Sequence, residues 1–281
     1  MAEAPNWDLY VMEYARSKNQ PWVDLISGMY KEGVMDLPFS FILARQGKRN
    51  LLIDTGFMQE SEPTGFSRKF GIPTWISPLR MLAEMGLRAD DITDIILTHA
   101  HFDHMGSIAE FPRAHVYIQK SELLSWYEMF ALPKRFGHLT MIVDPDNIRT
   151  ALEASFQHRV TLVDGDKDNL LLGIHVRLGS GHTIGQQFVV VETAAGRRVI
   201  SGDCVYSRRQ FTGLNNDGVY APLNNAVVLS YSVYHSTTPQ HRALLAKVGG
   251  NLRAFVSLCK HAVEDKPDPL EYLAYVRAST K

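Results

Sequence analysis

The chain has 281 residues, of which 45% are hydrophobic and 21% are charged, and its formal net charge is −1. This composition supplies enough apolar residues for a sizeable core and excludes a chain that stays disordered. The balanced charge argues against nucleic acid as the principal partner, because binding to phosphates needs an excess of basic residues.

Residues 1–8 are acidic and lack the basic start and apolar stretch of a signal peptide. No apolar run approaches the roughly 20 residues that span a bilayer. Cys204 and Cys259 are too few cysteines for a disulfide scaffold. We therefore expect a cytoplasmic protein with reduced thiols and no membrane partner. No repeat, low-complexity tract or linker divides the sequence, which predicts a single domain over residues 1–281.

Short β-rich runs begin the chain, at residues 8–14, 39–45 and 50–54. The polar segment 46–49 contains a glycine and separates the last two runs, which predicts a hairpin. Residues 78–85 have the spacing of a helix, with Ser77 as its N-cap and Gly86 as its C-cap. Residues 92–97 are short and β-branched, as in a buried strand.

The second half of the sequence continues with a strand at residues 116–119 and a helix at 121–130, for which Ser121 is the expected N-cap. Further strands are predicted at residues 160–163, 175–178, 187–192 and 198–201. The last predicted elements are a helix at 238–248, a strand at 254–258 and a helix at 267–278. Many short strands with a few helices favour layered sheets with helices outside, rather than a regular βαβ alternation.

The segment LTHAHFDHMGS follows the strand at residues 92–97 and places His99, His101, Asp103 and His104 within six positions. Side chains two residues apart leave an extended backbone on the same side. One short segment can therefore offer two nitrogens to one cation, and an oxygen plus a nitrogen to a second. Mixed nitrogen and oxygen ligands suit Zn²⁺, and also Fe, Mn or Co. We predict metal binding here, because a solvated loop has no physical reason to gather three histidines.

Four side chains cannot complete two metal sites, so further ligands are expected after other strands. His182, Asp203 and His261 each follow an apolar strand, at positions where loops gather at one edge of a sheet. Asp54 is interpreted as a turn residue and Cys204 as a packed thiol. The remaining histidines are interpreted as ordinary surface or core residues: His115, His138, His158, His175, His235 and His241.

The segment from His99 to His104 resembles the HxHxDH signature of the metallo-β-lactamase superfamily. The segments LLIDTG, GHTIGQ, SGDCVY and CKHAVE follow the superfamily's landmarks in order, between about residues 38 and 261. Within the superfamily the sequence is most similar to the N-acyl homoserine lactonase branch. LPFSFILARQGKRNLLIDTGF resembles the first hairpin of that branch, and Tyr206 follows Asp203 by three residues, as in the branch. The sequence around His261 departs from the branch's Gly-His-Asp-Pro.

The resemblance implies an α/β (α+β) fold, a four-layer αββα sandwich of two mixed β-sheets flanked by helices. It also implies two divalent metal ions, Zn²⁺ first, with Fe, Mn or Co as alternatives. The first ion would be held by His99, His101 and His182. The second would be held by Asp103, His104 and His261, with Asp203 bridging the two.

The implied reaction is the hydrolysis of a cyclic ester, by attack of a metal-bridging hydroxide on its carbonyl. The substrate would be an N-acyl homoserine lactone, as in quorum quenching, or an aromatic lactone. Tyr206, unless it is a packing residue, would stabilise the developing oxyanion, and Asp103 would pass a proton to the leaving alkoxide.

Several alternatives stay open. The same centre could hydrolyse a cyclic amide such as a lactam, an aryl ester or a phosphotriester. A di-iron oxidoreductase is a second class, and near-neutral charge disfavours a nuclease. Residues 65–76 and 126–138 are aromatic and basic, and form either a lid over the pocket or ordinary surface. A homodimer is expected by analogy.

Overall fold

Residues 6–25, 33–58, 71–72 and 74–205 are described by the structure, which is a computed structural model. The chain divides into two units, Met1–Tyr206 and Ser207–Lys281, and the description concerns the first. The predicted elements at 238–248, 254–258 and 267–278 lie outside the described residues. The single domain over the whole chain stays a prediction.

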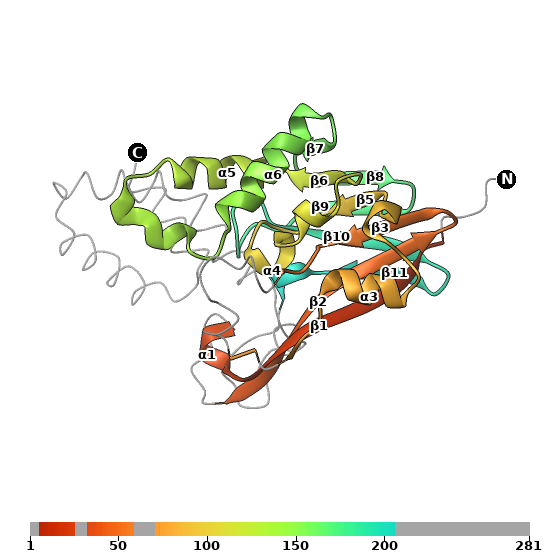
Figure 1. Ribbon diagram of the computed structural model, residues 1–281, viewed down its shortest axis with the longest axis horizontal. Coiled ribbons are helices and arrows are strands. Elements are labelled where there is room, and N and C mark those ends of the chain that lie inside the picture. The colour runs from red at the N-terminus through yellow and green to blue at the C-terminus, as the bar shows by residue number, and fades with distance from the viewer. Residues whose placement is uncertain (1–5, 26–32, 59–70, 73, 206–281) are drawn as a thin grey trace, which may run out of the picture. The chain divides into compact units, whose positions relative to one another are not determined.

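A seven-stranded sheet forms the centre of the described part (Figure 1), with the order β4-β1-β2-β3-β5-β6-β7. Its strands are β1 (Asp8–Pro21), β2 (Val34–Gln46), β3 (Arg49–Ile53), β4 (Thr74–Trp75), β5 (Asp94–Ile96), β6 (His115–Gln119) and β7 (Val160–Val163). The pairs among β4, β1, β2 and β3 are antiparallel, whereas β3, β5, β6 and β7 are parallel. The sheet is therefore mixed, and the parallel strands bring their carboxyl ends to one edge.

The second sheet has four antiparallel strands among the described residues, in the order β11-β10-β9-β8. These are β8 (Lys167–Leu171), β9 (Ile174–Leu178), β10 (Gln187–Thr193) and β11 (Gly196–Ile200). An apolar cluster that includes Ile174, Val176, Val189 and Val191 packs it against the first sheet.

Helices cover the other face of the seven-stranded sheet. They are α3 (Pro78–Glu84), α4 (Phe102–Met105), α5 (Lys120–Phe130) and α6 (Pro145–Phe156), whereas α1 (Trp22–Leu25) directly follows the end of β1. Short 3₁₀ helices lie at Ala89–Asp91, Ile108–Glu110, Lys134–Thr140 and Gly202–Cys204. In Figure 1, α3 runs beside β1, and α5 and α6 run beside β6 and β7, in agreement with their contacts.

Strand alternation explains why the two cores form. In β3, Leu52 faces the helices, whereas its neighbours Leu51 and Ile53 face the second sheet. In β5, Ile95 and Ile96 divide in the same way, and all five side chains are fully buried. Because successive side chains point to opposite faces, a strand that is apolar at every position must be covered on both sides. The two cores therefore stack a layer of helices, the seven-stranded sheet and the four-stranded sheet, which is the order of layers in the predicted αββα sandwich.

The predicted hairpin is confirmed, since β2 and β3 pair across a turn in which Gly47 has a φ of 59°. The helix predicted at 78–85 is confirmed as α3, with Ser77 as its N-cap. Its C-cap is Met85, so the prediction of Gly86 as the C-cap was wrong by one residue. Gly86 follows with a φ of 74°, a left-handed conformation that glycine adopts without the steric cost of a side chain.

Other predictions need correction. The N-cap of α5 is Gln119, and Ser121 lies inside the first turn, so the prediction for Ser121 was wrong. The helix α6 was not predicted, although Asp144 accepts a hydrogen bond at its N-cap and Pro145 begins it. The strand β8, whose residues KDNLL are mostly polar, was not predicted either. Helical crossovers join the parallel strands, so part of the sheet does follow a βαβ pattern.

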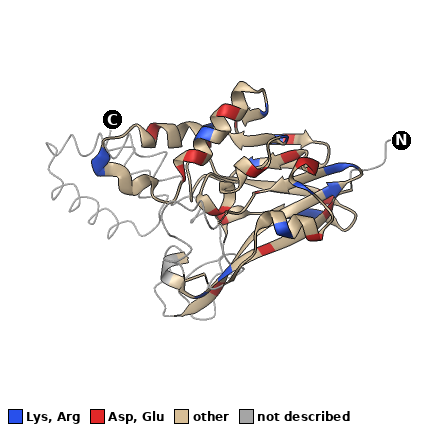
Figure 2. Cartoon of the chain, in the orientation of Figure 1, with Lys and Arg blue, Asp and Glu red and all other residues tan. Residues whose placement is uncertain are grey.

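Among the described residues, no helix has both the length and the apolar character that crossing a bilayer requires. Lys and Arg are interspersed with Asp and Glu over the described elements (Figure 2).

Candidate metal centre

The HxHxDH segment begins where buried β5 ends. His99 and His101 are buried in the turn after the strand, and α4 follows at once with Asp103 and His104. Phe102 and Met105 of this one-turn helix belong to the core between helices and sheet, which anchors the turn. The apolar residues of the segment thus hold its polar residues in place.

Gly106 ends the segment at a close approach between chain segments. A Cβ atom at this position would lie 2.1 Å from the carbonyl oxygen of Phe102 and 2.7 Å from Cβ of Phe57. Any larger residue would push the turn away from Phe57, in the loop that follows β3.

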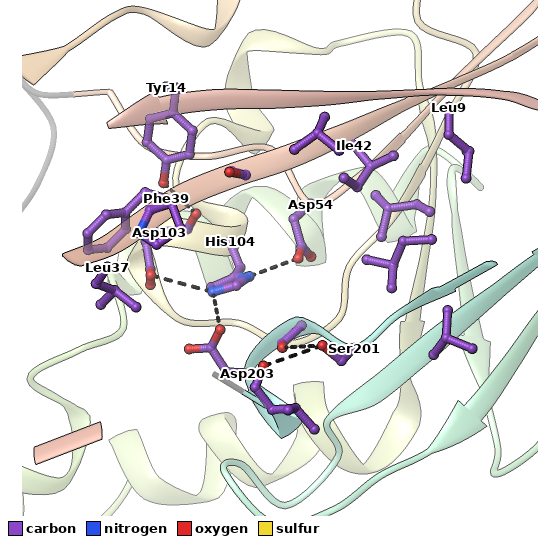
Figure 3. Close-up of a pocket in the computed structure, with 18 of the residues that line it drawn as sticks. Leu9, Tyr14, Leu37, Phe39, Ile42, Asp54, Asp103, His104, Ser201 and Asp203 are labelled. Atoms are coloured by element: carbon purple, nitrogen blue, oxygen red, sulfur yellow. Dashed lines mark hydrogen bonds and ion pairs between the residues drawn. The ribbon is translucent and has the colours of Figure 1, made fainter. Parts of the chain in front are cut away.

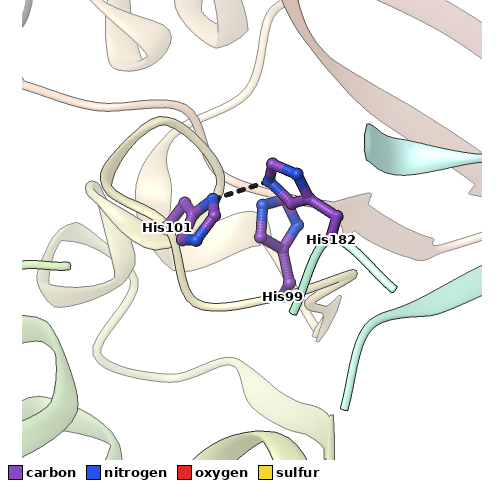
Figure 4. A group of neighbouring side chains, drawn as sticks. All are labelled: His99, His101 and His182. Atoms are coloured by element: carbon purple, nitrogen blue, oxygen red, sulfur yellow. Dashed lines mark hydrogen bonds between the residues drawn. The ribbon is translucent and has the colours of Figure 1, made fainter. Parts of the chain in front are cut away.

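A first group of ring nitrogens comes from His99, His101 and His182, and we call it the imidazole group (Figure 4). His182 arrives from the loop between β9 and β10, in the other sheet. Its Nε2 lies 2.8 Å from Nδ1 of His101, and the donor atoms of the three residues all lie within 4.8 Å of one another. Among the described residues, the buried Nε2 of His99 has no hydrogen-bond partner.

A second group comes from His99, His104 and Asp203, and we call it the carboxylate group. Oδ1 of Asp203 lies 3.2 Å from Nε2 of His104, while Oδ2 lies 3.4 Å from Nε2 of His182. The same carboxylate therefore contacts residues of both groups. Asp103 is close, with Oδ2 at 3.4 Å from Nε2 of His104 (Figure 3).

The protonation of the histidines differs between the groups. Burial, together with neighbouring imidazoles, holds the pKa of His99 and of His101 well below the usual range, and burial also lowers the pKa of His182. Burial acts in the same direction on His104, but Asp203, Asp103 and Asp54 outweigh it and raise the pKa of His104 well above its usual value. The imidazole group therefore offers neutral nitrogens, whereas in the carboxylate group a positive charge is favoured at His104.

These residues fit a divalent metal ion. Metal binding requires unprotonated imidazole nitrogens, which burial favours at three of the histidines. A buried ring nitrogen without a partner, as in His99, is otherwise costly. Nitrogen and carboxylate donors together suit Zn²⁺ and neighbouring transition metals.

Asp54 orients the second group, a role that the sequence analysis did not find. It follows β3 with a φ of 64°, so it is a turn residue as predicted. Its carboxylate accepts hydrogen bonds from the backbone N–H of Thr98 at 2.7 Å and from the hydroxyl of Thr98 at 2.9 Å. Oδ2 lies 2.8 Å from Nδ1 of His104. A carboxylate on the second ring nitrogen fixes both the tautomer and the direction of an imidazole. The sequence signal for this role was the position of Asp54 at the carboxyl end of β3, the strand beside β5.

Cys204 lies outside both groups. Its thiol is 3.5 Å from the carbonyl oxygen of Gly179, and burial raises its pKa to about 12. These observations agree with the interpretation as a packed thiol. Tyr206 and His261 lie outside the described residues.

The histidines interpreted as ordinary residues lie away from the two groups where the structure describes them. Nε2 of His115 lies 2.7 Å from the hydroxyl of Thr161, and Nδ1 of His175 lies 3.2 Å from Asp168. His235 and His241 lie outside the described residues.

A cavity of about 530 Å³ adjoins the carboxylate group (Figure 3). Asp103, His104 and Asp203 line one end of it, and the rest is mostly apolar. Its apolar lining is Leu9, Val11, Leu37, Pro38, Phe39, Ile42, Ile53, Val199, Ile200 and Val205. Of the proposed lid segments, 65–76 falls largely outside the described residues. No residue of the segment 126–138 lines this cavity, and its Trp126 is a buried core residue whose ring lies with its centroid 5.7 Å from that of His101.

The chain resembles proteins whose names contain hydrolase or lactonase. A protein of Mycobacterium tuberculosis named a probable metallo-hydrolase is 29% identical over 181 residues, which are 58% of this chain and 55% of the relative. The chain thus spans about half the length of this mycobacterial relative. An N-acyl homoserine lactonase of Bacillus cereus is 24% identical over 188 residues, covering 63% of this chain and 68% of the relative.

Solved structures share the fold. An N-acyl homoserine lactone hydrolase with the product N-hexanoyl-L-homoserine bound at its catalytic metal center has a TM-score of 0.58 at 19% identity, over 82% of this chain and 86% of that one. The hydrolase AbOPH of the beta lactamase superfamily has a TM-score of 0.56 at 23% identity, over 74% and 75% of the two chains.

The family model of the metallo-beta-lactamase superfamily matches residues 36–238. The matched region includes both sheets' central strands and the residues of both groups. The chain therefore belongs to the metallo-beta-lactamase superfamily.

Proposed function

We propose that the chain is a metal-dependent hydrolase that opens a cyclic ester, either an N-acyl homoserine lactone or an aromatic lactone. The observation that carries the proposal is the placement of Asp203 between two groups of metal-binding side chains, beside an apolar cavity. The similarity to an N-acyl homoserine lactonase of Bacillus cereus supports the substrate class.

Two divalent ions, Zn²⁺ in the first instance, are assigned to the site. His99, His101 and His182 would hold one of them, and Asp103, His104 and His261 the other, with Asp203 shared. Bound divalent ions activate water as a nucleophile near neutral pH and polarise a carbonyl oxygen.

Asp103 is assigned the proton transfer to the leaving alkoxide. Its carboxylate faces the cavity, and its backbone carbonyl accepts a hydrogen bond from the hydroxyl of Tyr14 at 2.8 Å. Burial, followed by the charges of Asp103, Asp54 and Asp203, raises the pKa of Tyr14 well above its usual value, so its phenol stays protonated and keeps donating. Tyr206 is assigned the hydrogen bond to the oxyanion that forms from the carbonyl.

The cavity suits a substrate with an apolar ring or chain. Leu37, Phe39 and Ile42 of β2 form one wall, and Val199 and Ile200 of β11 form another. Ligand cavities of this size are mostly apolar, with a few polar groups that set the orientation. Here the carboxylates of Asp54, Asp103 and Asp203 in the lining lie beside His104.

A pH-drop assay with a panel of lactones, lactams, aryl esters and phosphotriesters tests the proposal, alongside metal analysis of the same preparation. We expect the lactones to be turned over fastest, by a colourless protein with about two zinc ions per chain, as the two groups imply. Preferred cleavage of another bond in the panel would refute the lactone assignment, and a coloured di-iron protein that cleaves no member of the panel would refute hydrolysis.

The predicted homodimer is checked by light scattering of the purified protein, and the predicted cytoplasmic location by cell fractionation.

A further inference from the structure

Glu122 is a carboxylate that lies wholly inside the protein. It belongs to the first turn of α5, and its side chain is fully buried. Burying a carboxylate is costly unless its oxygens accept several hydrogen bonds. Within the part of the chain that the structure describes, its two oxygens accept four hydrogen bonds, all from neutral donors. A buried charge is a poor source of net stability. The segments that supply the four donors indicate another role for Glu122.

The two oxygens of Glu122 bind two different loops. Oε1 accepts from the backbone N–H of Ala100 at 3.0 Å, and Ala100 stands between His99 and His101. Oε2 accepts from the hydroxyl of Thr183 at 2.6 Å and from the backbone N–H of Gly185 at 2.8 Å. Thr183 follows His182 directly, so one carboxylate joins the HxH turn of one sheet to the His182 loop of the other.

The His182 loop lies directly on the backbone of α5. A Cβ atom at Gly185 would lie 2.1 Å from the backbone nitrogen and 2.5 Å from Cα of Glu122. Only glycine permits this approach, which brings the backbone N–H of Gly185 to the carboxylate. Two independent features, a close contact and a pair of hydrogen bonds, therefore fix the same loop.

Trp126 extends the support to the ring of His101. Its indole N–H donates to Oε1 of Glu122 at 2.7 Å. One turn along the helix from Glu122, its ring also meets the imidazole of His101 edge to face, with centroids 5.7 Å apart. Glu122 thereby acts on His101 through both the backbone of the HxH turn and the indole.

We propose that Glu122 is a positioning residue, which holds the HxH turn and the His182 loop at the separation that the imidazole group needs to bind a divalent ion. The inference rests on the proposed metal-dependent function. The carboxylate contacts neither a substrate nor the ion. It acts by setting the distance between His101 and His182, whose ring nitrogens lie 2.8 Å apart.

The test is a titration of the metal-free full chain with Zn²⁺ against a chromophoric chelator, which resolves the successive binding steps. The variant His101→Ala removes a ligand of the imidazole group alone and identifies the step that belongs to this group. In Glu122→Gln, an NH₂ group replaces an acceptor oxygen. We expect that step to weaken by about 10- to 100-fold while the other step changes by less than about threefold. The Co²⁺ absorption spectrum of the same step should shift.

The matched control is Glu128→Gln, the same chemical change on an exposed position of α5, which should leave both steps unchanged. If Glu122→Gln does not fold, Thr183→Val, which keeps the carboxylate and removes one donor, provides the same comparison with a smaller effect in the same direction.

If Glu122→Gln bound Zn²⁺ with wild-type affinity in both steps, the inference would be overturned and the proposed function would stand. Equal weakening of both steps, with a lower melting temperature of the metal-free protein, would also overturn it, because it would reveal a general structural role. A wild-type chain that binds no Zn²⁺ would overturn the proposed function together with the inference.

Discussion

The imidazole group and the carboxylate group share His99 but would attract a cation by different means. In the imidazole group the rings of His99 and His101 are buried and that of His182 is partly exposed, burial lowers the pKa of all three, and loops of both sheets supply them. The carboxylate group places His104 among Asp203, Asp103 and Asp54, whose charges favour a cation there. The imidazole group therefore depends on the accurate placement of its rings, whereas the carboxylate group depends on the charge around His104.

Each group has a supporting carboxylate of its own. Asp54 contacts His104 directly, through Nδ1 at 2.8 Å. Among the described residues, Glu122 makes no hydrogen bond to a ring of either group, and it supports the imidazole group through the backbone N–H of Ala100 and the His182 loop. The electrostatic effect on His104 needs only an anion nearby, whereas the placement of the imidazole rings needs loops that are held rigidly. Substitutions should therefore separate the two groups.

The largest effect is expected at Asp203, which contacts both groups. Asp203→Asn should lower kcat/KM by more than about a hundredfold and weaken both Zn²⁺ binding steps, since loss of a shared ligand exceeds the loss of a supporting residue. Asp164→Asn, at a side chain that is 82% exposed, is the control. If only one binding step changed, Asp203 would belong to one group rather than to both.

A loss of rate without a loss of metal is expected at Tyr206. Tyr206→Phe removes the proposed oxyanion donor and should reduce kcat by about a hundredfold, or ~3 kcal/mol, while both Zn²⁺ steps stay unchanged. Steady-state kinetics and metal analysis measure the two quantities. A rate close to that of the wild type would identify Tyr206 as a packing residue.

The two groups should come apart in Asp54→Asn. This substitution removes the charge beside His104, and we expect the step of the carboxylate group to weaken by about 10- to 100-fold, the reverse of the pattern for Glu122→Gln. The exposed Asp36→Asn serves as the control. Equal weakening of both steps would show that the groups are not independent.

A moderate effect is expected at Gly185, where the His182 loop meets α5. The added methyl group in Gly185→Ala overlaps the backbone of Glu122 and should destabilise the fold by about 1–3 kcal/mol. The imidazole group should also lose affinity, since its loop is displaced. Gly137→Ala is the control, because no atom lies within 4 Å of a Cβ at that exposed glycine. Thermal unfolding compares the two, and equal melting temperatures would contradict the close contact.

The smallest effect concerns Asp91, a carboxylate remote from both groups that provides a reference for pH. The backbone N–H of Arg88 donates to it at 2.8 Å and lowers its pKa below the ordinary 3.8. The folded pKa is lower than the unfolded one, so this interaction stabilises the protein above pH 3.8 and its contribution is lost as the pH falls further. Asp91→Asn should be slightly less stable at neutral pH, and the difference should shrink in acid. Denaturant titrations at several pH values measure the free energy of unfolding of both proteins. A difference between them that does not change with pH would contradict this assignment.

The secondary structure that could be predicted was the part with strong local signals. The short apolar runs of β3 and β5 and the Ser77-Pro78 start of α3 are local signals, and they agree with the structure. The strand β8 is mostly polar, and Asn169 has a φ of 46°, so its sequence lacks a strand pattern. It pairs with β9 through contacts that no local signal reports.

The candidate site divides in the same way. The spacing of His99, His101 and His104 made them predictable from the sequence, and the structure brings them near His182 and Asp203. Asp54 and Glu122 were not predictable, because a lone carboxylate after a strand or in a helix has many ordinary roles. Their contacts with His104 and Thr183 span 50 and 61 residues of chain.

The sequence by itself determined which side chains can donate nitrogen and oxygen to a metal, and that they follow strands. Only the tertiary structure decided the division into a neutral and an anionic group, and the two carboxylates that support them. The reason is physical: the identity of a donor atom is a local property. Its charge environment, in contrast, depends on burial and on distances of a few ångströms between segments remote in the chain.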